Sequence, residues 1–538
     1  MMERQYTSPT LGDVAQYAVA ACGVMPRKAR NRDDETEFDQ GMAKTYQKKM
    51  QRLAKEDCNL QEAFEDIAQL LTASLGRYIR CPFWAEQIRD LLNELYGSYA
   101  SMVKHMGTMM TKRDTTRFFL TSYGIDVAVR SLAHNWVVLQ GYIYAAPQPM
   151  EPCWYLPSNV EGELSTPLDK VLGWAYSACG LTLATFHDPI GVVGDTTKLK
   201  QNERAVRSWK NGKHLPSLPA LVSILEDSFQ ALASIGKPVE QRLQDGIITC
   251  AAIARITTSI SKDIQEQLGT EYLQDLLGQA RLYSGWMKAE INTYMASLNQ
   301  AVDARLAEHF AAGLADEIIR LEAFERVELG IKMAPHFWAL FEGKRHNASE
   351  LLLSHRDAEG HVSDDVVQWI AIRYGAYAAR VRSDSISRWS IDKPGLFDLY
   401  LQKALSLRNG SDVTLAAVEA LHAEMTLAGV AERLPWLMHW LRGIVCYRKE
   451  DYGTASSHYI KAFQLAKYSA GELQYSLANQ YLEVMAKTKQ WRRFKQGVRW
   501  ANYLDIPVRW LREKEPTEEN IRNAYGILGL EAVRYARM

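Results

Sequence analysis

Apolar residues recur three and four positions apart along most of the chain, which is the spacing of an α-helix with one buried face. This spacing is regular in Gln241–Thr257 and Ile264–Leu298, and from Val366 onward helices of about 15 residues alternate with short turns. Strand-like alternation is rare. Trp136–Tyr144 is the one candidate, and a buried helix explains it equally well. The pattern predicts an all-α, multi-domain protein.

One proline-rich segment interrupts the helical pattern between Ala145 and Pro167. Because proline ends helices, we interpret residues 146–167 as a linker, and Trp154 and Tyr155 predict that it packs against a surface. A polar break is expected at Asn347–Asp365. The predicted units are an N-terminal helical domain, a helix-turn-helix-like module, a second helical domain and C-terminal helical repeats, at residues 1–145, 168–235, 236–345 and 366–538.

Small residues stand at fixed intervals in the C-terminal part of the chain. Gly443, Ala455 and Ala462 are spaced by 12 and then 7 positions, with large Tyr447 and Tyr459 between them. This segment resembles a tetratricopeptide repeat, a family in which small side chains stand where the two helices of a hairpin approach closely. The resemblance implies an α-solenoid whose groove binds a protein or peptide partner. The alternative is an ordinary helical bundle that contains one such hairpin.

A looser copy of the pattern follows 39 residues later, and the resemblance covers Leu434–Leu504. Gln490-Trp491 takes the place of Asp451-Tyr452, and Trp500-Ala501 takes the place of Lys461-Ala462. Two features depart from the family. Phe494 stands where the first copy has Ala455, and Lys467 stands where the family has a helix-ending proline.

The segment from Leu199 to Leu218 resembles the second half of a repressor-type helix-turn-helix domain. Its Trp209-Lys210-Asn211-Gly212 run is typical of a recognition helix that ends at a left-handed glycine. Pro216 then starts a helix whose inward face carries Leu218, Leu221, Ile224 and Leu225. The first helix of the pair is expected within Val171–Leu183, where Gly180, His187-Asp188-Pro189 and Gly191 disturb the family's spacing.

This helix-turn-helix resemblance implies contact with DNA. Between Asp195 and His214 six Lys and Arg residues stand against two acidic residues, a local excess of four positive charges of the kind that phosphate contacts require. The alternative is a helical corner that kept the fold without reading DNA. The residues expected to meet double-stranded DNA are Lys200, Arg204, Arg207, Ser208, Lys210 and Lys213, and we expect Arg204, Arg207, Ser208 and Lys210 to project outward.

A second basic segment, Lys487–Lys514, interleaves aromatic and basic side chains. Aromatic rings beside arginines can stack on bases or hold acidic peptides. The alternative is a repeat hairpin whose aromatics are core and whose basic face is solvated, which the helical spacing of the rings favours. The candidate partner-binding residues here are Trp491, Arg492, Arg493, Lys495 and Arg499.

Charge, cysteine content and motifs limit the possible functions further. Lys plus Arg and Asp plus Glu both number 63 in 538 residues, so no global charge draws the chain to nucleic acid or to an anionic membrane. Seven scattered cysteines, the absence of a leader and the absence of a long apolar run favour a cytoplasmic protein with reduced thiols and no membrane contact. No catalytic, phosphate-binding or metal-ligating motif is present, so we expect no metal, no cofactor and no enzymatic activity.

Three functional hypotheses follow. The first is a non-enzymatic regulator or sensor that binds a protein or peptide in its repeats and acts on DNA through the helix-turn-helix module. The second is a protein-binding scaffold subunit of a bacterial multi-component system, such as phage defence, without DNA binding. The third is an enzyme of unrecognised type within Met1–Tyr144 or Val239–Phe341, because catalytic groups are often far apart in sequence.

Overall fold

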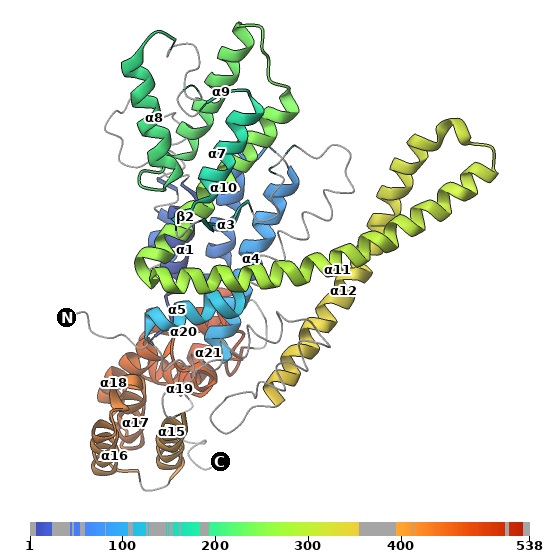
Figure 1. Cartoon of the computed structure of the whole chain (residues 1–538). Coiled ribbons are helices and arrows are strands. Elements are labelled where there is room, and N and C mark those ends of the chain that lie inside the picture. The colour runs from blue at the N-terminus through green and yellow to red at the C-terminus, as the bar shows by residue number, and fades with distance from the viewer. Residues whose placement is uncertain are drawn as a thin grey trace.

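The computed structural model describes residues 7–23, 44–45, 48–53, 60–80, 82–105, 111–124, 127–128, 147, 149, 154–160, 163–182, 185, 193–354, 394–410, 413–511 and 516–530. Across these residues the chain is almost entirely helical, which confirms the all-α prediction (Figure 1). One short antiparallel pair of strands, β1 (Ser158–Val160) and β2 (Glu163–Ser165), lies within the predicted linker and was not expected from the sequence. The candidate strand at 136–144 falls outside the described residues.

The N-terminal part folds into α1 (Leu11–Cys22), α3 (Leu60–Leu75), α4 (Pro82–His105) and α5 (Lys112–Phe119), followed by a π-helical turn, η2 (Leu120–Gly124). A capping box starts α1. The Thr10 hydroxyl accepts from the Asp13 amide at 3.1 Å, and the Asp13 carboxylate accepts from the Thr10 amide at 2.8 Å.

The middle part contains α7 (Pro167–Ala178), α8 (Thr196–Lys210), α9 (Leu218–Ser234) and the long α10 (Gln241–Leu268). All residues from Gly246 to Arg255 in α10 are buried, so this apolar run is a core helix. The last residue of this buried run, Arg255, is charged. The buried Arg255 donates to the carbonyl of Pro216 at 3.0 Å and to that of Ala21 at 2.6 Å, and thereby joins α10 to the ends of α9 and α1.

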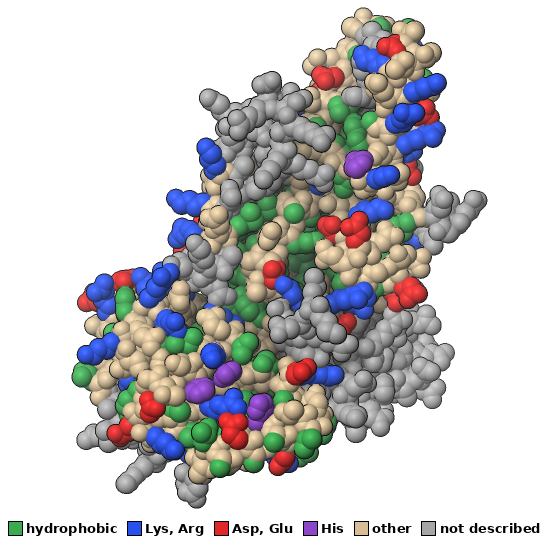
Figure 2. All heavy atoms as spheres, turned by 90° about the vertical axis from the view of Figure 1, so that its left-hand side faces the viewer, with side chains coloured by type: hydrophobic (Ala, Val, Ile, Leu, Met, Phe, Trp, Pro, Cys, Tyr) green, Lys and Arg blue, Asp and Glu red, His purple; other side chains and the backbone are tan. Residues whose placement is uncertain are grey.

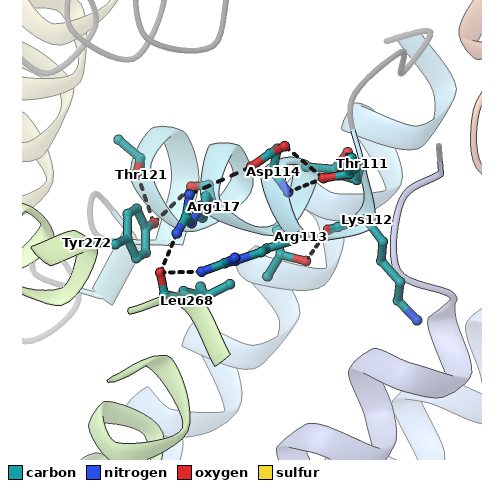
Figure 3. Close-up of polar contacts among 10 residues, drawn as sticks. Thr111, Lys112, Arg113, Asp114, Arg117, Thr121, Leu268 and Tyr272 are labelled. Carbon is teal, nitrogen blue, oxygen red and sulfur yellow. Dashed lines mark hydrogen bonds and ion pairs between the residues drawn. The ribbon is translucent and has the colours of Figure 1, made fainter. Parts of the chain in front are cut away.

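Gly269 makes a sharp corner between α10 and α11 (Thr270–Ala311), with φ 103° and ψ 155°, a conformation that favours glycine. Figure 3 shows how α5 holds this corner. Arg113 and Arg117 both donate to the carbonyl of Leu268 at the end of α10, Arg113 at 3.1 Å. The hydroxyl of Tyr272 donates to the carbonyl of Arg117 at 3.0 Å. Two cations thus meet the negative end of the α10 dipole.

Helices α11 and α12 (Ile318–Ser354) form an antiparallel hairpin, joined at η3 (Ala315–Glu317), that projects from the body of the molecule (Figure 1). The hairpin has its own small core, in which Tyr294 and Leu298 of α11 pack near Leu329, Met333 and Phe337 of α12. Helix α12 continues through Asn347 to Ser354, so the polar break predicted from Asn347 does not end this helix.

The C-terminal part consists of antiparallel helices that follow one another at intervals of about 40 residues per pair. Their bounds are α15 (Pro394–Asn409), α16 (Leu415–Leu427), η4 (Ala431–Arg433), α17 (Pro435–Arg448), α18 (Tyr452–Ala466), η5 (Gly471–Leu473), α19 (Gln474–Lys487), α20 (Trp491–Tyr503) and α21 (Glu518–Leu530).

The N-terminal helices pack directly against one edge of these C-terminal helices. The Ser8 amide donates to the carbonyl of Tyr468 at 3.0 Å, and the buried Gln474 side chain donates to the carbonyl of Val103 at 3.0 Å. A single hydrophobic core runs from α1 through α10 to α21, and it includes Trp154 and Tyr155 of the predicted linker. No helix in the described part of the chain is both long and apolar enough to span a membrane.

Candidate partner- and nucleic-acid-binding surfaces

Local hydrogen bonds fix both ends of α8. The Asp195 carboxylate accepts from the amides of Thr197 and Lys198, each at 2.9 Å, and so caps the first turn. At the other end Gly212 has φ 69°, which confirms the predicted left-handed ending. The following helix starts later than expected, because Ser217 is its N-cap and Pro219, not Pro216, lies in its first turn.

Helix α8 lies at the periphery and buries little of its surface (Figure 1). Only Asn202 and Val206 are buried, while Trp209 is half-buried against the core. On α9, Leu218, Leu221 and Leu225 are fully buried, as predicted for its inward face, whereas Ile224 is half-buried. The long polar face of α8 is therefore open to solvent.

Most of the predicted DNA-binding side chains stand on this open face. Lys200, Arg204, Arg207 and Lys213 are exposed. Arg207 forms an ion pair with Glu203 at 2.5 Å, one helical turn away on the same surface. Such an exposed pair is weak enough for a phosphate to replace the carboxylate. Ser208 is half-buried, so it projects less than the sequence pattern predicts.

Lys210 has a different role from its neighbours. Its ammonium group lies 2.7 Å from the Asp169 carboxylate on α7 and 5.7 Å from the centre of the Tyr176 ring. Burial alone would disfavour the charge, but the hydrogen bond and charge of Asp169 outweigh it and raise the pKa of Lys210. Lys210 holds α8 against α7 and does not project outward as expected.

The spacing of α7 and α8 departs from a tight helix-turn-helix. Helix α7 ends at Ala178, within the segment expected for the first helix, and α8 begins at Thr196. Seventeen residues, 179–195, separate them, and 183–184 and 186–192 fall outside the described residues.

In the C-terminal helices, the small residues stand where two helices meet. A side chain at Gly443 would place its first carbon 3.0 Å from the ring of Tyr459, so α17 and α18 approach closely at this glycine. Ala455 and Ala462 are fully buried. These contacts show a packed helix pair with its small residues at the close-contact positions of a repeat hairpin.

The second hairpin, α19 with α20, reaches the same close packing with the glycine on the other helix. Leu482 takes the place of Gly443, and Gly497 takes the place of His458, 39 residues on in each case. A side chain at Gly497 would lie 2.8 Å from both Leu482 and Tyr481. Phe494 is fully buried where the first hairpin has Ala455.

The turns inside the two hairpins are also alike. Glu450 and Lys489 stand 39 residues apart, and both adopt a left-handed conformation, with φ 61° and 56°. The next amide in each turn, Asp451 or Gln490, donates to the carbonyl five residues earlier, at 3.0 and 2.8 Å. The two hairpins therefore share a backbone turn that also ends other helices of the chain, for example at Gly212 and Gly429.

No family model, curated protein or solved structure matches this chain. The resemblance to tetratricopeptide repeats and to repressor-type domains therefore rests on the residues and helix pairs described above.

The basic residues of α20 differ in their exposure to solvent. Arg492 and Arg493 are exposed, whereas Arg499 is half-buried. Lys495 forms an ion pair with Glu518 of α21 at 2.5 Å. The half-buried Trp491 has ring contacts with Phe494 and Tyr525 at centroid distances of 6.2 and 5.1 Å, which fits the core role that its helical spacing favours.

The sequence interpretation missed a cluster on α16, α17 and α18. Nδ1 of His439 and Nδ1 of His458 lie 3.4 Å apart, and Nη2 of Arg442 lies 3.3 Å from Nδ1 of His422. We call these four residues the histidine cluster. The repeat alignment could have revealed this cluster. His439 stands four positions before Gly443, and His458 stands one position before Tyr459. Residues at these two positions face each other across an antiparallel hairpin. Among the described residues, no group of three or more His, Cys, Asp or Glu side chains is placed to hold a metal ion.

Proposed function

We propose that this chain works by binding rather than by catalysis, as a regulatory or sensor protein whose C-terminal helical repeats hold a protein or peptide partner. The observation that carries this proposal is the succession of two packed hairpins, α17–α18 and α19–α20, with a glycine at each close helix contact. Stacked hairpins of this kind form an α-solenoid, and such arrays usually bind a partner along an extended surface.

One edge of the repeats is already filled by the N-terminal helices, through Tyr468, Gln474 and their neighbours. A partner must therefore use another face. Arg492 and Arg493 on α20 are both exposed and carry positive charge that an acidic partner could meet, and Lys495 nearby forms an ion pair with Glu518. Trp491 contributes the accessible part of its ring.

A second candidate function, DNA binding, is supported by α8. Lys200, Arg204, Arg207 and Lys213 expose four positive charges on one short segment of an otherwise neutral chain. Such a segment suits contacts to phosphates more than to base edges, because long basic side chains reach the backbone without a fixed geometry.

Two charge-reversal variants test these functions and serve as controls for each other. The variant Lys200→Glu with Arg204→Glu should abolish retardation of a mixed-sequence duplex in gels and leave partner binding intact. The variant Arg492→Glu with Arg493→Glu should do the opposite. DNA binding should also weaken strongly between about 50 and 200 mM salt.

The scaffold alternative, a protein-binding subunit of a bacterial multi-component system, predicts a different result. A stoichiometric protein partner would then co-purify with the wild-type chain, and the duplex would not be retarded at either salt concentration. An enzyme would instead require a deep polar site, and turnover by the purified chain would reject the binding proposal.

A further inference from the structure

The histidine cluster lies on an open face of the repeats. Figure 2 shows histidine side chains gathered with Lys, Arg, Asp and Glu side chains on the lower part of the molecule, where the repeats lie. His422, His439 and His458 come from α16, α17 and α18, and all three are half-buried. Three successive helices therefore bring one imidazole each to a common surface.

The charges around the cluster are mostly positive. Arg442 on α17 and the exposed Lys461 on α18 are cations, and among the described residues Glu419 on α16 is an anion that pairs with Arg442. With neutral histidines these groups sum to +1, because two positive charges oppose one negative charge. With all three histidines protonated the sum is +4. Each proton that the cluster takes up therefore adds to a charge that is already positive.

Glu419 pairs with Arg442, and one of its carboxylate oxygens also lies 3.8 Å from Nδ1 of His422. Its charge partly offsets the effect of the cations on the pKa of His458. Its carboxylate accepts two hydrogen bonds from Arg442, at 2.7 and 2.8 Å, which fixes the guanidinium plane. His439 and His458 face each other with no acid between them. Burial first, and then neighbouring cations, lower the pKa of both His439 and His458.

The geometry points to a binding site for a phosphate-type oxyanion at the histidine cluster, with affinity that rises as the histidines gain protons. Nδ1 of His439 and Nδ1 of His458 share one hydrogen bond at 3.4 Å in this structure, and once both rings are protonated the two atoms are both donors that can reach one oxygen about 2.8 Å from each of them. A tetrahedral anion has further oxygens for His422 and Arg442. A carboxylate is less suited, because its two oxygens cannot meet three imidazoles and a guanidinium together.

Sulfate is the probe of choice, because it stays a dianion over the whole pH range in which histidine titrates. Any change in its affinity then reports protonation of the protein. By linkage, sulfate must raise the pKa of each histidine that it contacts, and acid must tighten sulfate binding by the same coupling. The measurement needs only the purified full chain, so it does not depend on the proposed partner or on DNA.

We expect sulfate to bind about fivefold or more tightly at about pH 6 than at about pH 8. In spectra of the histidine ring protons, sulfate should raise the pKa of His439 and His458. His336, exposed on α12, is the internal control and should not respond. Equal sulfate affinity at both pH values would overturn the proposal.

Variants locate the site. The double variant His439→Gln and His458→Gln should lose the pH-dependent binding, while the control His336→Gln should keep it. Circular dichroism and urea unfolding at about pH 8 check that the double variant folds, since both histidines are neutral there in the wild type. Unchanged sulfate binding in a folded double variant refutes the assignment. Stabilisation by Zn²⁺ but not by sulfate refutes it as well, because the imidazoles would then be metal ligands.

Two sources of the oxyanion share this chemistry. Inorganic phosphate and a phosphoserine peptide should both displace sulfate from the cluster. A peptide that binds more tightly than inorganic phosphate assigns the site to a phosphorylated chain, whereas equal affinity assigns it to the free ion.

Discussion

The hairpins α17–α18 and α19–α20 have the same turn and the same helix pairing, yet they differ at nearly every contact position. The first hairpin has Gly443 opposite Tyr459 and a histidine at position 458. The second has Leu482 opposite Gly497. In both hairpins the two helices approach closely where one of them has a glycine. The glycine stands on the first helix in one hairpin and on the second helix in the other.

This exchange changes which side chains the two hairpins present. The first hairpin keeps His439 and His458 at the positions where the second has Ala478 and Gly497. One repeat thus presents a titratable pair on its surface, while its neighbour uses the same positions for packing. The comparison teaches that the repeat frame is structural and that the side chains at equivalent positions carry the specific chemistry.

The largest expected effect comes from filling the glycine contact in the second hairpin. Gly497→Leu should destabilise the protein by about 3 kcal/mol, because even the first side-chain carbon would lie 2.8 Å from Leu482 and Tyr481. Urea unfolding measures the loss. Gly526→Leu is the matched control, since that helical glycine has nothing within 4 Å, and it should be neutral or stabilising.

A smaller effect tests whether glycine and leucine are partners. Gly497→Ala should cost less in a Leu482→Ala background than in the wild type, with a coupling of about 1 kcal/mol. The rescue should be partial, because Tyr481 remains at 2.8 Å from the added carbon. Strictly additive free energies of unfolding in this double-mutant cycle would show that the two positions do not exchange roles.

Low pH should reduce the stability of the first hairpin, which contains the histidine pair, more than that of the second. The pKa values of His439 and His458 are lower in the folded state than the ordinary value of 6.5, so folding disfavours their protonation. Their contribution to stability is therefore present above about pH 6.5 and is lost as the pH falls through the lowered values. In sulfate-free buffer, the double variant His439→Gln and His458→Gln should lose less stability between about pH 7.5 and 5.5 than the wild type. An equal loss would place the acid sensitivity elsewhere.

The smallest expected change in stability comes from the turn that both hairpins share. Glu450 and Lys489 both adopt left-handed backbone conformations, which cost less for glycine than for other residues. Glu450→Gly and Lys489→Gly should each stabilise the protein by about 0.5 kcal/mol, after the added flexibility of the unfolded chain is counted. Thermal unfolding of each single variant measures this. A gain at one turn and a loss at the other would show that the turns are not equivalent.

Features that depend on neighbours in sequence were predictable. Helical spacing predicted the all-α fold, the Asn211-Gly212 pair predicted the left-handed end of α8, and small residues predicted the close contact of α17 with α18. Their physical basis is local, since caps, turns and helix faces depend on residues within one or two helical turns. The predicted domain limits and the roles assigned to individual basic residues stay predictions.

Features that depend on distant segments required the tertiary structure. Lys210 has the same local pattern as Arg207, but only the position of Asp169 on another helix turns it inward. The sequence likewise gives no sign that the N-terminal helices would cover an edge of the repeats, or that Arg113 and Arg117 would hold the corner at Leu268. The partners of these groups stand tens to hundreds of residues away, and periodicity carries no information about which faces meet. The sequence by itself indicated that helices form and which faces they bury, although the start of α9 and the extent of α12 differ from the prediction, whereas long-range packing decided which charged side chains are exposed.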